Sequence, residues 1–122
     1  MVFDGALASC GLLRAPTWVQ LEAGRAVAAG GEAAEWLLST LDAGGEYGRS
    51  IAEIGIGINP GAPLTGVIGV DEKALGTAHL AFGTSASFGG ANVAAVHIDG
   101  ILLQPTIELD GEVLMVAGVL AV

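Results

Sequence analysis

The sequence has little cysteine, few basic residues and no long apolar run. Among its 122 residues Cys10 is the single cysteine, which rules out an intrachain disulfide and is typical of a reducing compartment. Lysine and arginine number 4 against 13 acids, and the net charge of -9 makes nucleic acid and anionic membranes unfavourable partners. No apolar run reaches the roughly eighteen residues of a transmembrane helix, and no signal-peptide pattern is found. We therefore expect a cytoplasmic protein.

Glycine and apolar residues are abundant instead. The chain holds 20 glycines, and 52% of its residues are hydrophobic. This composition predicts many tight turns and places where backbone segments come close together. The length predicts one domain, residues 1–122, large enough for a hydrophobic core.

Residue spacing predicts an α+β fold, mainly antiparallel or mixed β-sheet with one principal helix. The expected elements are hairpin strands over 17–22 and 25–28, a helix over 32–41, a strand over 51–58, a helical turn over 71–75, a strand around His79, a glycine and serine loop over 83–90, and strands over 93–98, 106–109 and 113–120, the last two joined through Asp110-Gly111.

The most informative string is Val96-His97-Ile98-Asp99-Gly100. Residues two apart in a strand point to the same face, so His97 and Asp99 can present an imidazole and a carboxylate side by side. Such a pair suits a divalent metal. The alternative is a strand that runs into a turn, with Asp and Gly serving the backbone.

Two further residues are candidates to complete a metal site. His79 lies at one end of an apolar run, and Glu53 interrupts a run of isoleucine, alanine and glycine in which an acid is costly unless it is paired or coordinated. Imidazole and carboxylate ligands suit zinc, manganese, iron or cobalt. The alternatives are hydrogen-bonded core histidines and a solvent-facing glutamate on an edge strand.

Four short segments carry a more specific pattern, and they are Ala52-Glu53-Ile54-Gly55-Ile56-Gly57 with Asn59-Pro60-Gly61, Asp71-Glu72-Lys73 with Gly76-Thr77-Ala78-His79, Phe88-Gly89-Gly90 with Asn92, and His97-Ile98-Asp99-Gly100 with Leu109-Asp110-Gly111. In this order they resemble the carboxy-terminal part of the aminopeptidase T-like family, thermophilic metallopeptidases that include leucyl aminopeptidases.

The resemblance implies a metal-dependent hydrolase that cleaves amino-terminal peptide bonds with a metal-activated water. Carried over by position, it implies Glu53, His79, His97 and Asp99 as metal ligands and Glu72 as general base or extra ligand. The metal would be zinc, cobalt or manganese, with iron possible, and the substrate a peptide or other small molecule. The family is longer at its amino terminus, so a homo-oligomer or a partner chain supplying the missing half is expected.

Two other hypotheses remain open. A tyrosine of the peptidases falls on Ala86 here, whereas a related branch resembles ring-opening dioxygenases of dihydroxypyridines, in which two histidines and one aspartate hold iron. His79, His97 and Asp99 satisfy that requirement. The other hypothesis is a metal-binding or small-molecule-binding domain that has lost its chemistry.

Overall fold

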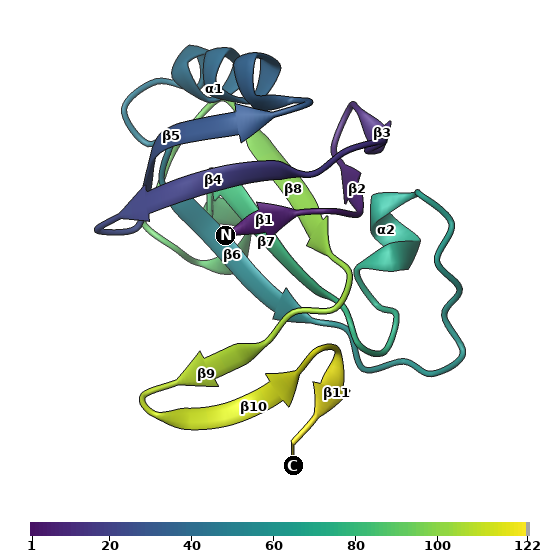
Figure 1. The fold of residues 1–122 in the computed structure, drawn as a ribbon. Coiled ribbons are helices and arrows are strands. Elements are labelled where there is room, and N and C mark those ends of the chain that lie inside the picture. The colour runs from purple at the N-terminus through teal and green to yellow at the C-terminus, as the bar shows by residue number, and fades with distance from the viewer. Residues whose placement is uncertain (122) are drawn as a thin grey trace.

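The computed structural model describes residues 1–121, which form three antiparallel sheets and one principal helix (Figure 1). The expected α+β class is confirmed. No helix in this range is long and apolar enough to cross a membrane.

One sheet and the principal helix belong to the amino-terminal part. The sheet has the order β1-β4-β5 and is built from β1 (Val2–Phe3), β4 (Thr17–Glu22) and β5 (Arg25–Gly31). Helix α1 (Ala34–Ala43) lies over β5 (Figure 1). Leu37 and Leu41, one helical turn apart, form its buried face.

The largest sheet has five strands in the order β3-β2-β8-β7-β6. Its members are β2 (Ala6–Leu7), β3 (Gly11–Leu12), β6 (Ile51–Ile56), β7 (Ala78–Gly83) and β8 (His97–Leu102). Two short helices lie on its connections, α2 (Ile68–Asp71) between β6 and β7 and the 3-10 turn η1 (Ala86–Phe88) between β7 and β8.

The third sheet is carboxy-terminal and has the order β11-β10-β9, from β9 (Ile107–Leu109), β10 (Glu112–Val116) and β11 (Val119–Leu120). It lies at the opposite end of the molecule from α1 (Figure 1).

The core lies between the first sheet with α1 and one face of the five-stranded sheet. It includes Phe3, Leu7, Val19, Leu37, Leu41, Leu80, Phe82 and Ile98. The rings of Phe3 and Phe82 meet edge to face with centroids 6.4 Å apart. This packing joins the amino-terminal sheet to β7.

Both predicted hairpins are confirmed. Ala23-Gly24 joins β4 to β5 and Asp110-Gly111 joins β9 to β10, and all four residues have positive φ. Two such residues in succession give the turn whose twist matches paired strands.

Three predicted elements are placed differently by the structure. The strand over 113–120 is divided by a further turn at Ala117-Gly118, also with positive φ, which alanine did not signal. The helical turn over 71–75 lies earlier, at Ile68–Asp71, where the Asp71 carboxylate accepts the backbone N–H groups of Thr65 and Gly66 and so holds the loop that leads into α2. The strand over 93–98 begins only at His97, since the preceding residues close a loop.

Candidate metal centre

The candidate site is the face of β6, β7 and β8 that points away from the core. Directly paired residues lie on the same face of a sheet. Ala81 pairs with Glu53 on one side and with Asp99 on the other, and His97, two residues before Asp99, shares that face. His79, two residues before Ala81, is there too, so the sheet brings the four predicted ligands together.

A β-bulge turns Glu53 toward this face. Ile51 pairs with Phe82 and packs against the core, whereas Glu53, two residues later, pairs with Ala81 on the other face. In a regular strand, Ile51 and Glu53 would share a face. The extra residue Ala52 in β6 reverses the alternation and sends the carboxylate to the histidines.

The Glu53 carboxylate lies between the two imidazoles. Its Oε1 is 3.2 Å from His79 Nε2, and its Oε2 is 3.3 Å from His97 Nε2. His97 Nε2 is also 3.3 Å from Asp99 Oδ2. Two sets of three donors, each within 4.8 Å of one another, share Asp99: one contains Glu53 and His97, the other Glu72 and His79. All five residues predicted from the sequence therefore meet here.

A backbone carbonyl fixes the orientation of His97. Its Nδ1 lies 2.8 Å from the Thr84 carbonyl oxygen, which can only accept, so Nδ1 carries the hydrogen and donates it. In the neutral ring the Nε2 lone pair then faces two carboxylates. A proton or a cation is needed between these groups, and a second partner on the far nitrogen is the usual arrangement of a metal-bound histidine.

The His79 ring is packed over a glycine. A β-carbon at Gly55, its cross-strand partner, would lie 2.0 Å from His79 Cε1. The Nδ1 atom of His79 is buried and has no hydrogen-bond partner within residues 1–121. When Nε2–H donates to Glu53, the Nδ1 lone pair faces no donor, so the ring is hydrogen-bonded only on its Glu53 side.

The charge of the cluster also favours a cation. Burial raises the pKa of Asp99; His97 and His79 lower it in part, and the carboxylates of Glu53 and Glu72 raise it further. Lys73 offsets part of this charge through its ammonium group, 2.6 Å from Glu72 Oε1. A divalent ion would offset the remaining negative charge, so the residues present fit a metal.

A cavity of about 390 Å³ opens beside the cluster at its His79 end. Its size suits a small molecule. Its walls combine the carboxylates and imidazole with apolar side chains, and they are Glu53, Gly55, Ile56, Ile58, Asn59, Glu72, Lys73 and His79.

Two contributors to the site were missed from the sequence. Gly55 makes room for the His79 ring, and its only signal was its place between two isoleucines. Thr84 acts through its carbonyl oxygen, which any residue could supply, so no side-chain pattern could reveal it.

Comparison with family models and with curated proteins gives no match. The fold is similar to a solved structure, the 2,5-dihydroxypyridine dioxygenase from Pseudomonas putida KT2440, with a TM-score of 0.82 and 22% sequence identity. The likeness covers 99% of this chain and 39% of that chain. The present chain thus spans well under half the length of the protein whose fold it shares.

This finding corrects the first functional hypothesis. The aminopeptidase T-like resemblance is not supported, and the metallopeptidase and hydrolase readings are wrong, because the structural neighbour is a dioxygenase. The role of Glu72 as base for a hydrolytic water falls with them. The four sequence segments describe the strands and glycine turns that hold the cluster, and a shared scaffold does not determine the reaction.

Proposed function

We propose that this chain is the metal-binding part of an iron-dependent dioxygenase that opens a hydroxylated aromatic or heterocyclic ring. The observation that carries the proposal is that His79, His97 and Asp99 lie on one sheet face, with Asp99 in one set of donors with each histidine, within a fold shared with a dihydroxypyridine dioxygenase. Two histidines and one carboxylate form the set of ligands used by non-haem iron oxygenases.

Iron is the metal that we infer for this site, in preference to zinc, cobalt and manganese. Zinc, cobalt and manganese also suit imidazole and carboxylate donors, and the donor types alone do not choose among them. The choice rests on the combination of the triad with the dioxygenase fold. Iron bound by such a triad supplies one-electron chemistry with oxygen and keeps positions open for substrate.

The protein groups would orient the reactants and hold protons. The Thr84 carbonyl accepts from His97 Nδ1–H and keeps Nε2 directed into the cluster. The Glu53 carboxylate lies within 3.3 Å of both Nε2 atoms, where it can accept a proton from a substrate hydroxyl. The apolar walls at Ile56 and Ile58 would exclude water from one side.

The structural neighbour is a longer protein than this chain. We propose that residues 1–122 act as one domain of an assembly, with a second copy or a partner chain completing the site, because the chain matches only 39% of its structural neighbour. Strand β6 is an edge of the five-stranded sheet, and Ile54 on it is exposed. Gel filtration at the mass of a monomer would contradict this assignment.

Oxygen uptake tests the enzymatic proposal. The protein is loaded with iron(II) without oxygen and then mixed with oxygen and 2,5-dihydroxypyridine, and wild type is compared with Asp99→Ala. We expect uptake of oxygen with loss of the ring absorbance in wild type only. Iron binding without oxygen uptake would contradict the enzyme and indicate a domain that only binds metal, and the absence of iron binding would contradict both.

A further inference from the structure

A large aromatic side chain stands beside the cluster with little cover. Phe88, in η1, is 63% exposed, and its ring centroid lies 5.9 Å from that of His97 at a tilt of 44°. An aromatic ring stabilises a fold chiefly by the surface it buries, so Phe88 contributes little in this way. Single exposed apolar residues are common on proteins, so the exposure of Phe88 does not by itself indicate a binding site. The loop that carries Phe88 gives the further evidence.

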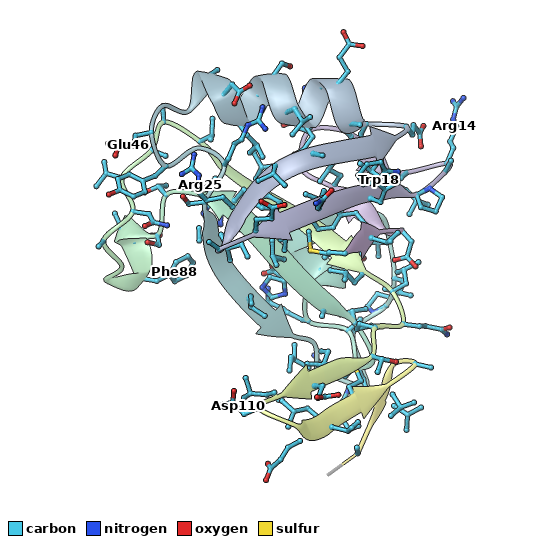
Figure 2. The ribbon with its side chains drawn as sticks, turned by 60° about the vertical axis from the view of Figure 1, so that its left-hand side comes forward. Arg14, Trp18, Arg25, Glu46, Phe88 and Asp110 are labelled. Carbon is cyan, nitrogen blue, oxygen red and sulfur yellow. The ribbon has the colours of Figure 1, made fainter. Side chains whose placement is uncertain are left out.

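The loop that carries Phe88 is closed by hydrogen bonds. Thr84 N–H donates to the Val96 carbonyl at 2.8 Å, and Ser85 N–H donates to the Asn92 carbonyl at 3.0 Å. The Asn92 amide donates to the Ile51 carbonyl at 3.2 Å and thereby ties the loop to β6. In Figure 2, Phe88 points from the η1 turn toward the strands.

Two glycines shape the turn that follows Phe88. Gly89 has φ +79, and a β-carbon at Gly90 would lie 2.2 Å from Ser85 Oγ. The positive φ at Gly89 and the close approach of Ser85 at Gly90 both favour glycine. These constraints hold Phe88 at the tip of the loop, next to a proposed ligand.

Exposure distinguishes the two ends of the cluster. The side chain of His97 is 26% exposed and that of His79 is 10% exposed, so His97 is the more accessible of the two imidazoles. Phe88 stands at this end, whereas the cavity opens at the His79 end and does not include Phe88 among its walls.

We propose that Phe88 is the stacking wall of the substrate site, against which a flat, electron-rich ring with hydroxyl groups lies while its oxygen atoms reach the cluster. This inference rests on the proposed function and names the part of it that selects an aromatic substrate. Ring pairs with centroids about 4.5–7 Å apart attract each other beyond what their buried area contributes. Phe88 is thus a positioning residue that favours planar ligands over other chelators.

Ligand titration of the iron-loaded full chain, without oxygen, tests the inference. The aromatic probe is 4-nitrocatechol, followed by its absorbance, and the non-aromatic probe is acetohydroxamate, which also offers two oxygen donors. Phe88→Leu should weaken 4-nitrocatechol binding about three- to tenfold and leave the affinities for acetohydroxamate and iron unchanged. Phe88→Trp should restore 4-nitrocatechol binding.

Two control variants complete the design. Leu109→Ala removes a side chain of similar exposure, 60%, next to the labelled Asp110 and away from Phe88 in Figure 2, and should change nothing. Val93→Ala removes an exposed side chain, 72%, from the same loop as Phe88, and should leave 4-nitrocatechol binding unchanged.

Each contrary result has a distinct meaning. Unchanged 4-nitrocatechol affinity in Phe88→Leu, or an equal loss in Val93→Ala, would overturn the inference while the proposed function stands. Equal loss of acetohydroxamate or iron affinity in Phe88→Leu would show that Phe88 only supports His97, and would also overturn it. Failure of the wild type to bind iron would overturn the proposed function and this inference together.

Discussion

The two faces of β7 have opposite roles although they alternate along six residues. Leu80 and Phe82 face the core, whereas His79 and Ala81 face the cluster. Every residue of the strand is buried, so the difference is one of chemistry and not of solvent access. One face is covered by packed apolar side chains, and the other by imidazoles and carboxylates contributed by the neighbouring strands.

The comparison shows where stability is gained and where it is given up. The core face gains free energy from apolar burial, whereas the site face holds Asp99 with a raised pKa beside other carboxylates. Groups gathered for binding commonly destabilise the fold that carries them. Substitutions on the two faces should therefore separate stability from metal binding.

Phe82→Ala should have the largest effect on folding. Phe82 is fully buried and meets Phe3 edge to face, so truncation leaves a cavity and should lower the free energy of unfolding by about 3–5 kcal/mol. Urea unfolding measures the loss. Metal content per folded molecule should not change, and a loss of metal with little change in stability would contradict the separation of the faces.

Gly55→Ala should have an intermediate effect, which appears in both the free energy of unfolding and the metal affinity. The new methyl group would meet the His79 ring, and the displacement should cost about 1–3 kcal/mol and weaken metal binding. Gly69→Ala is the matched control, because a β-carbon there meets nothing within 4 Å. Equal metal affinity in both variants would show that the His79 position does not matter.

Asn92→Ala should have the smallest effect. It removes the amide that ties the Phe88 loop to β6, at a cost of about 1 kcal/mol, and should speed amide hydrogen exchange over residues 84–96. Asn59→Ala removes the side-chain oxygen that accepts the Gly61 N–H in a different loop. This variant should leave hydrogen exchange over residues 84–96 unchanged. Exchange that is equally fast in both variants would contradict the anchoring role.

The sequence predicted what depends on local spacing. His97 and Asp99 share a face because the period of a strand is two, and the β4–β5 hairpin follows from alternation around a glycine turn. The grouping of Glu53, Glu72, His79, His97 and Asp99 also agrees with the positions inferred from the family resemblance. Their role as ligands remains a prediction.

The sequence could not predict what depends on contacts between distant segments. The bulge at Ala52 is visible only in the pairing of β6 with β7, and it decides which face receives Glu53. The position of α2 depends on backbone N–H groups in the preceding loop, which donate to the Asp71 carboxylate. The reaction itself was misread because strands and turns that hold ligands are compatible with several chemistries.

Metal content gives the sharpest test of the proposed site, measured on protein purified without a histidine tag and incubated with iron(II) under nitrogen. Wild type is compared with His79→Ala, His97→Ala and Asp99→Ala, and with Leu109→Ala as the control on the carboxy-terminal sheet. We expect stoichiometric iron in wild type and in the Leu109→Ala control, and we expect the three site variants to lose the iron. Equal iron in all five proteins, or none in wild type, would contradict it.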